Sequence, residues 1–162
     1  MPEIPQRADL STWIRDTDRR LRALETAPRA TATSQPWGYS FLDVAQSTNS
    51  TTYVNLTTAG PTVTMDVGQT CSVFVTASAY ITTPANTSGL VGLFIDNALW
   101  GDVLTFSNSS TATLAINSTT QRAIVDTDVL AEGSHTFQLR YRSSSSSSSV
   151  TFGARFLSVQ PF

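Results

Sequence analysis

Apolar and polar residues alternate along most of the chain between residues 37 and 162. In residues 63–67 and 72–81, every second residue is apolar, and the residues between them are polar except Phe74 and Tyr80. Strict alternation of this kind is typical of strands that bury one face and expose the other. Two more such segments are residues 136–142 and residues 112–116, in which we expect Ala112, Leu114 and Ile116 to point inward.

Two segments carry apolar residues on both faces. Residues 90–95 have no alternation and predict a strand that is covered on both sides. In residues 150–159, alternation places Phe152 and Phe156 on one face and Leu157 and Val159 on the other. Strands of this kind fit either a protein core or a subunit interface, so we take six residues as candidates for a core or trimer face: Leu93, Ile95, Phe152, Phe156, Leu157 and Val159.

Turn signals separate these segments. The pair Asp96-Asn97 tolerates positive φ and predicts a tight turn after residues 90–95. Residues 143–149 are seven consecutive serines between two alternating segments, which predicts a hairpin tip that contributes little to stability. About eight to ten short strands without helical periodicity predict an all-β fold, in the form of a two-sheet sandwich or jelly roll over residues 37–162.

Residues 9–27 follow a different pattern. Leu10, Ile14, Thr17, Leu21 and Leu24 are separated by alternating intervals of four and three residues, as in the seam of a coiled coil. Asp9 or Ser11 can cap the start of this helix, and Pro28 ends it.

The predicted helix is short, and two interpretations of it remain. At about 16 to 18 residues, the helix is close to the lower limit at which an isolated helix is even marginal in water, so it needs a partner. That partner is either the domain of the same chain, against which an amphipathic helix folds back, or the same helix in other chains. We favour a bundle of chains, because residues 28–36 form a polar linker with nothing to pack.

Composition and charge exclude several classes of protein. The formal net charge of −2 gives no basic surface for nucleic acid, and no apolar run approaches the ~20 residues needed to cross a bilayer. The first thirty residues are charged, which is unlike a secretory signal. The single cysteine, Cys71, cannot form an internal disulfide.

No constellation of residues predicts an enzyme or a cofactor site. His135 is the only histidine, and no Gly-x-Ser-x-Gly motif accompanies it, so we expect a structural histidine, no catalytic residue and no transition-metal site. Asp96, Asp102, Asp126 and Asp128 are weak candidates for calcium ligands. We therefore expect no enzymatic activity and no cofactor.

The whole arrangement resembles a known type of protein. A "WIRDTDRRLRALE" helix leads through a polar linker into a β-domain that ends "EGSHTFQLRYR" and "RFLSVQPF". This organisation is similar to the small fibre, minor tail or head-decoration proteins of tailed bacteriophages of actinobacteria. Their terminal domains resemble trimeric jelly rolls of the tumour-necrosis-factor and complement-head type, which bury one apolar sheet face at a three-fold axis.

The resemblance implies a homotrimeric virion protein, on the tail or on the capsid. Residues 1–8 would be an extended anchor that binds other virion proteins, residues 9–27 the coiled coil, residues 28–36 the linker and residues 37–162 the jelly-roll head. A bacterial surface glycan is an expected ligand of the head, with no nucleic acid and no membrane insertion. The alternative is a secreted lectin-like or cytokine-like trimeric module, which a signal peptide or paired cysteines would have favoured.

Overall fold

The computed structural model describes residues 37–125 and 130–162. The predicted seam residues Leu10, Ile14, Thr17, Leu21 and Leu24, like the anchor and the linker, lie outside the described residues. Within the described ranges no helix is long and apolar enough to cross a membrane. The described secondary structure is entirely β, in nine strands: β1 (Gly38–Leu42), β2 (Gln46–Thr48), β3 (Thr62–Val67), β4 (Val73–Thr83), β5 (Thr87–Ile95), β6 (Ala98–Asn108), β7 (Leu114–Ile124), β8 (Gly133–Ser143) and β9 (Val150–Pro161).

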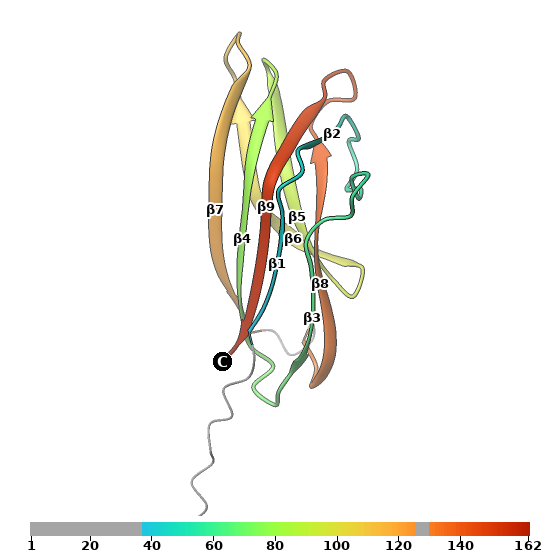
Figure 1. The fold of residues 1–162 in the computed structure, drawn as a ribbon, viewed down its shortest axis with the longest axis vertical. Coiled ribbons are helices and arrows are strands. Elements are labelled where there is room, and N and C mark those ends of the chain that lie inside the picture. The colour runs from blue at the N-terminus through green and yellow to red at the C-terminus, as the bar shows by residue number, and fades with distance from the viewer. Residues whose placement is uncertain (1–36, 126–129) are drawn as a thin grey trace, which may run out of the picture. The chain divides into compact units, whose positions relative to one another are not determined.

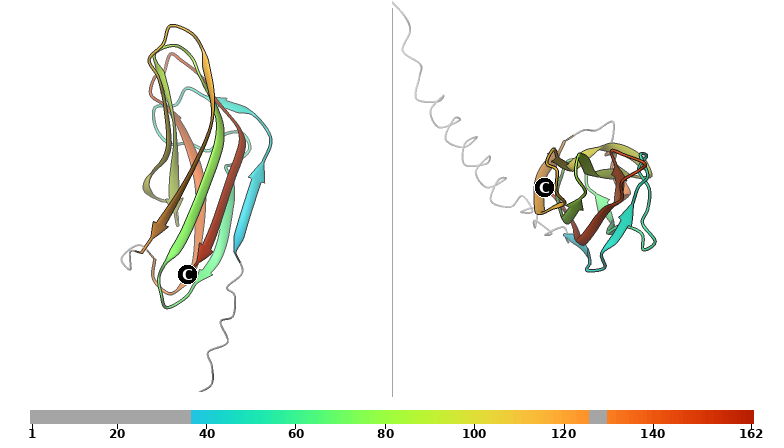
Figure 2. Two further views of the ribbon diagram at one scale, coloured as in Figure 1. Left: turned by 90° about the vertical axis from the view of Figure 1, so that its left-hand side faces the viewer. Right: turned by 90° about the horizontal axis from the view of Figure 1, so that it is seen from above.

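The strands form two antiparallel sheets that face each other (Figure 1). One sheet has the order β1-β9-β4-β7, with β2 also paired to β9, and we call it the β9 sheet. The other has the order β3-β8-β5-β6, and we call it the β8 sheet. The chain passes repeatedly from one sheet to the other, so that only β5 and β6 are consecutive neighbours within a sheet. This strand order is that of a jelly-roll-like sandwich, and the view from above in Figure 2 shows the strands surrounding a common interior. The all-β prediction is confirmed.

The core lies between the two sheets and is built from alternating residues. On β4, the residues Val73, Val75, Ala77, Ala79 and Ile81 are all buried, as the alternation predicted. The β8 sheet contributes mainly aromatic and long aliphatic side chains to the same core, namely Phe137, Leu139 and Tyr141 of β8 and Leu93 and Ile95 of β5.

The outer face of β5 is covered by the same chain. Leu90 and Phe94 on this face are both buried. Gly92 lies between them, and a Cβ atom built on it would come within 2.9 Å of the Tyr53 ring and 3.0 Å of Leu99. The segment between β2 and β3 therefore lays Tyr53 over β5. The two-sided apolar character of residues 90–95 is explained within one protomer and does not require a subunit interface.

A β-bulge in β9 changes the face on which its side chains lie. Tyr80 of β4 pairs with Gly153, whereas Ser78 pairs with Phe156, so that two residues of β9 oppose one residue of β4. Ala154, within the bulge, adopts a left-handed conformation with φ of 44°. After the bulge, Leu157 joins Phe152 in the core.

The prediction that Phe152 and Phe156 share a face opposite Leu157 and Val159 is therefore wrong. Phe152, Leu157 and Val159 are all fully buried between the sheets. Phe156 instead lies on the outer side of the β9 sheet, opposite Phe41 in the neighbouring strand.

The bulge also brings Arg155 into the interior, where the residue is fully buried. Its guanidinium group donates from Nη2 to the carbonyl oxygen of Val44 at 3.1 Å and from Nη1 to that of Thr58 at 3.3 Å. It lies 5.4 Å from the centre of the Tyr141 ring. Arg155 thus ties two loop segments to the middle of β9, through carbonyl oxygens instead of a carboxylate.

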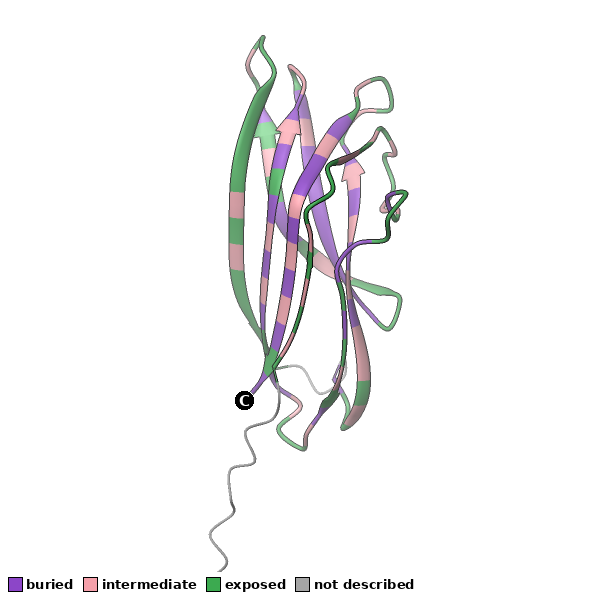
Figure 3. Ribbon diagram, viewed as in Figure 1, coloured by how far each residue is buried: buried purple, intermediate pink, exposed green. Residues whose placement is uncertain are grey.

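The prediction that Leu114 and Ile116 are inward is only partly right. Both residues pair with inward-facing residues of β4, Thr83 and Ile81, so they project from the inner side of the sheet. They are nevertheless 42% and 40% exposed, because β7 is an edge strand with no cover at this end. Figure 3 shows β7 exposed along most of its length, in contrast with β4 and β9.

The turns agree with their sequence signals, with one difference. Asp96 and Asn97 have φ of 50° and 69°, which confirms the tight turn between β5 and β6. The serine run connects β8 and β9, as predicted, but it is not a free tip. Ser143 is fully buried and donates its backbone N–H to Ser50 at 2.7 Å, and Ser144 donates to Ser88 at 2.9 Å.

Candidate functional site: an uncharged aromatic sheet face

Among the residues that the structure describes, the outer face of the β9 sheet carries no charged side chain. Cross-strand pairing aligns Tyr39 of β1 with Ser158 of β9, Ser158 with Thr76 of β4, and Thr76 with Gln121 of β7. The next row on the same face is Phe41, Phe156, Ser78 and Thr119. In every row the outward residues are aromatic, hydroxyl, amide or alanine side chains. Arg122, the charged residue of β7, pairs with the inward-facing Val75 and lies on the other side of the sheet.

Aromatic side chains are concentrated on this face. Tyr39 is 66% exposed, Phe41 54%, Phe74 39% and Tyr80 46%. The Phe74 ring stacks on Phe162 with ring centres 4.2 Å apart, and Trp37 lies 5.5 Å from Tyr39. Aromatic enrichment together with charge depletion is the composition of a buried interface core and not of an ordinary solvated surface. We call this surface the aromatic face.

A second exposed apolar area lies at the edge of the same sheet. Leu114 and Ile116, which project from the inner side of β7, are 42% and 40% exposed. β7 is hydrogen-bonded only to β4, so the main-chain groups along its other edge have no strand partner in the described residues. An exposed edge of eleven residues is a natural place for contact with another chain.

The candidate residues from the sequence fall into two groups. Leu93, Ile95, Phe152, Leu157 and Val159 are buried between the sheets, whereas Phe156 lies on the aromatic face.

Sequence reasoning missed the rest of the aromatic face, although the signal was present. In the segment "WGYSF" the aromatic residues Trp37, Tyr39 and Phe41 occupy every second position, and the residues between them are small. Such alternation marks one face of a strand, even though aromatic residues are usually assigned to the core.

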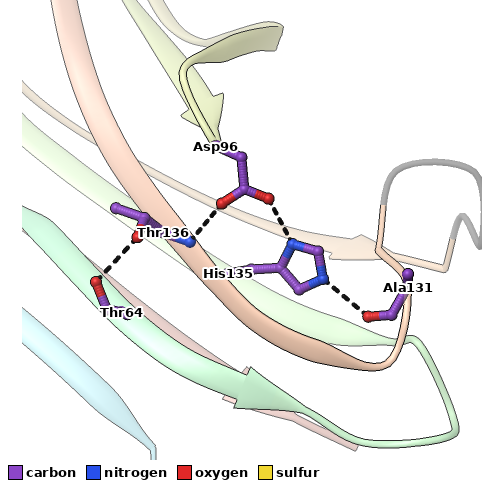
Figure 4. Close-up of polar contacts among 5 residues, drawn as sticks. All are labelled: Thr64, Asp96, Ala131, His135 and Thr136. Carbon is purple, nitrogen blue, oxygen red and sulfur yellow. Dashed lines mark hydrogen bonds and ion pairs between the residues drawn. The ribbon is translucent and has the colours of Figure 1, made fainter.

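A polar cluster around His135 lies at the start of β8 (Figure 4). The Nδ1 atom of His135 is 2.6 Å from Oδ2 of Asp96, and its Nε2 atom is 2.8 Å from the carbonyl oxygen of Ala131. The Thr136 backbone N–H donates to Oδ1 of Asp96 at 2.8 Å, while the Asp96 N–H donates to the Thr136 carbonyl at 2.9 Å. Asp96 is therefore bonded to Thr136 of β8 through both its side chain and its backbone.

Both ring nitrogens of His135 face acceptor oxygens, so both act as donors only when the imidazole is protonated. Partial burial opposes the charged form, but the hydrogen bonds to Asp96 and Ala131 outweigh it and raise the pKa of His135. Burial likewise opposes the ionised form of Asp96, but the hydrogen bonds from Thr136 and His135 lower the pKa of its carboxyl group. Since neither ring nitrogen is left for proton transfer, this geometry describes a structural clamp between β8, the β5–β6 turn and residue 131.

Metal ligation has little support in the described residues. They contain no group of three His, Cys, Asp or Glu side chains arranged to hold an ion. Asp96 is engaged by His135, and Asp102 by Tyr53 and Arg142. Asp126 and Asp128 lie outside the described residues.

Comparison with known proteins gives only distant similarities. No protein-family model matches the sequence, and no curated protein matches it significantly. Among solved structures, a chain of infectious bursal disease virus, Gt strain, aligns with a TM-score of 0.40 and 13% identity, over 84% of this chain and 35% of that chain. The CBM36-1 domain of a multidomain xylanase from the hindgut metagenome of Trinervitermes trinervoides aligns with a TM-score of 0.38 and 10% identity, over 78% and 98%.

A cycloisomaltooligosaccharide glucanotransferase of Paenibacillus sp. aligns with a TM-score of 0.34 and 12% identity, over 75% of this chain and 18% of the enzyme. The chain thus spans about a third of the viral chain and less than a fifth of the enzyme. Similarities this distant carry no argument about function.

Proposed function

We propose that this chain is a structural virion protein of a tailed bacteriophage, which assembles as a homotrimer and exposes a β-sandwich head. The observation that supports this most strongly is the aromatic face. Tyr39, Phe41 and Phe74 are each more than a third exposed on a surface without charge, a composition suited to burial against protein.

The chain offers two different surfaces for assembly. A closed ring with three-fold symmetry requires a heterologous contact, in which one patch of a protomer meets a different patch of the next. The aromatic face is the first patch. The second is the edge of β7 with Leu114 and Ile116, which offers apolar side chains beside unpaired main-chain groups. Packing the edge of one protomer on the aromatic face of its neighbour covers both.

The sequence outside the described residues fits the same assembly. The predicted coiled coil of residues 9–27 is joined by residues 28–36 to the segment that begins β1, a strand of the aromatic face. A parallel bundle would bring three copies of β1 toward one axis. The short helix would set chain number and register, and the head interface would supply most of the stability.

In this proposal the outer face of the β8 sheet points away from the three-fold axis, toward the surroundings of the virion. Residues 1–8 would contact other virion proteins, on the tail or on the capsid. The head would decorate the particle or attach it to the host surface.

Two measurements test the proposal. Multi-angle light scattering on the full chain at micromolar concentration should give three times the protomer mass of 17.4 kDa. A monomer at that concentration would contradict the trimer. Antibodies against the head should label virions in electron micrographs, whereas labelling of host-cell secretions alone would favour a secreted module.

A further inference from the structure

The two sheets differ sharply in the charge of their outer faces. The described residues contain four arginines, of which Arg155 is buried and Arg122 lies on β7. The other two, Arg140 and Arg142, are neighbours on β8 and point outward, because they alternate with the buried residues Leu139 and Tyr141. Residues i and i+2 of a strand share a face and lie about 7 Å apart. Two arginine side chains therefore leave neighbouring outward positions of one strand on the outer face of the β8 sheet.

Aromatic rings hold both guanidinium groups in place. Arg140 lies 4.3 Å from the centre of the Phe94 ring, and Arg142 lies 5.1 Å from the centre of the Tyr53 ring. The two rings meet edge to face at 5.8 Å, and the absence of a side chain at Gly92 makes room for Tyr53. A guanidinium group that stacks on a ring keeps its N–H donors in its own plane, where donors not used by the described residues, such as those on Nη1 of Arg140, can bind an acceptor.

The positive charge of this pair is only partly balanced. Oδ2 of Asp102 is 3.8 Å from Nη2 of Arg142, and its Oδ1 accepts a hydrogen bond from the Tyr53 hydroxyl. Arg140 has only amide partners: its Nε donates to Gln138 at 2.9 Å and its Nη2 to Asn97 at 2.5 Å. Within the described residues no carboxylate lies within 4.0 Å of Arg140. Two cations and one anion leave a net positive charge of one on an acidic protein.

We infer that Arg140 and Arg142 form a binding site for an oxyanion, a phosphate or carboxylate group carried on an acidic polymer. The arginine fork binds both groups with paired hydrogen bonds, and the preordered side chains lose little entropy on binding. The inference rests on the proposed function for the source of the polymer, the host surface, and for the outward direction of the β8 sheet. The site itself requires only the geometry of one protomer.

The test measures binding of the full chain to immobilised polyphosphate and to immobilised polygalacturonate, by biolayer interferometry at low and high salt. We expect binding to at least one polymer that weakens as salt rises. Binding to polyphosphate alone assigns the site to phosphate, and binding to polygalacturonate alone assigns it to carboxylate. The double variant Arg140→Gln with Arg142→Gln should lose binding at least tenfold. Arg122→Gln removes an arginine from β7 and serves as the matched control, which should bind like the unchanged chain.

Two results would overturn the inference: no binding of the unchanged chain to either polymer, or full binding by the Arg140→Gln, Arg142→Gln variant. Melting temperatures of both variants establish that they fold. Light scattering on the same samples separates this inference from the proposed assembly. A trimer that binds neither polymer overturns the oxyanion site alone, and a monomer that binds through the two arginines overturns the trimer alone.

Discussion

The ring of Phe74 stacks on the ring of Phe162 at 4.2 Å, with 25° between their planes. The pair joins the start of β4 to the residue that follows β9, and both rings remain exposed to a substantial degree. Even when stacked this closely, the two rings leave apolar surface in contact with water. Their contact with each other therefore does not explain why the aromatic face lacks charge. The proposed contact with another protomer would explain it.

Tyr39→Asp combined with Phe74→Asp tests that contact. Both residues are exposed in the protomer, so the variant should fold, but burying two unpaired charges in an interface is costly. We expect light scattering to give the protomer mass of 17.4 kDa and circular dichroism to give an unchanged β spectrum. Leu99→Asp, a substitution of a residue that is 49% exposed in the β8 sheet, is the control and should leave the trimer intact. If the double variant stays trimeric, the interface lies elsewhere on the protomer.

The predicted coiled coil can be separated from the head by Ile14→Asp with Leu21→Asp. Each charge would meet its own copy across the seam, so the helices should separate and the helical signal in circular dichroism should disappear. We expect the heads to remain trimeric, because two and a half heptads add little to a larger interface. Dissociation to monomers by this variant alone would make the helix the main assembly element.

The clamp between His135 and Asp96 predicts how stability depends on pH. Because the folded state raises the pKa of His135, its contribution is complete below the ordinary pKa of about 6.5 and is lost as pH rises through the higher folded value. Because the folded state lowers the pKa of Asp96, that contribution is present above the ordinary value and is lost as pH falls through the lower one. The clamp is therefore strongest at mildly acidic pH.

Thermal unfolding of the unchanged chain and of His135→Gln at a series of pH values checks this dependence. The variant should lose about 1–2 kcal/mol of stability near pH 5.5, which is at the low end for a charged hydrogen bond because the Asp96 side chain is 50% exposed. The difference between the two proteins should shrink as pH rises above the ordinary histidine pKa. A difference that stays constant or grows toward alkaline pH would contradict a protonated His135.

Tyr141 and Arg155 offer a contrast between two buried polar groups. The Tyr141 hydroxyl is buried without a hydrogen-bond partner in the described residues, and burial raises its pKa. Tyr141→Phe removes that unsatisfied group and should be neutral or stabilising in denaturant unfolding. Arg155→Ala should instead cost about 3 kcal/mol or more, because it leaves a cavity and deprives the carbonyl oxygens of Val44 and Thr58 of donors. A large loss of stability in Tyr141→Phe would reveal a partner for the hydroxyl group.

Much of the sandwich could be predicted from the sequence, because the alternation of apolar and polar residues in a regular strand shows which face is buried. β4 buries every second residue along its whole length, β8 does so from Phe137 onward, and the turn between β5 and β6 has the two residues that tolerate positive φ. The predictions failed where a strand is irregular, as in β9, or where other residues do not cover its inner side, as in β7. No local signal places a bulge at Ala154, and alternation in β7 does not reveal that Leu114 and Ile116 stay exposed on the inner side of the sheet.

Contacts between segments that are far apart in the chain could not be predicted from the sequence either. His135 and Asp96 are 39 residues apart, and only the pairing of β5 with β8 brings the β5–β6 turn to the histidine. Likewise, Tyr53 comes from a loop without periodicity and reaches β5 only because Gly92 leaves space for its ring. In both cases the residues can be read from the sequence, but the tertiary contact that brings them together cannot.

The bulge at Ala154 limits which length changes the chain can accept. Deleting Ala154 would let β9 pair regularly with β4 while Phe152 and Leu157 stay in the core, whereas deleting one residue elsewhere in β9 would turn the core side chains of one half of the strand toward solvent. A natural variant can therefore gain or lose residues in the serine loop, or lose the one extra residue of the bulge, far more readily than elsewhere in β9. Among diverging copies of this gene, the spacing between Phe152 and Leu157 should differ only by the presence or absence of that one residue.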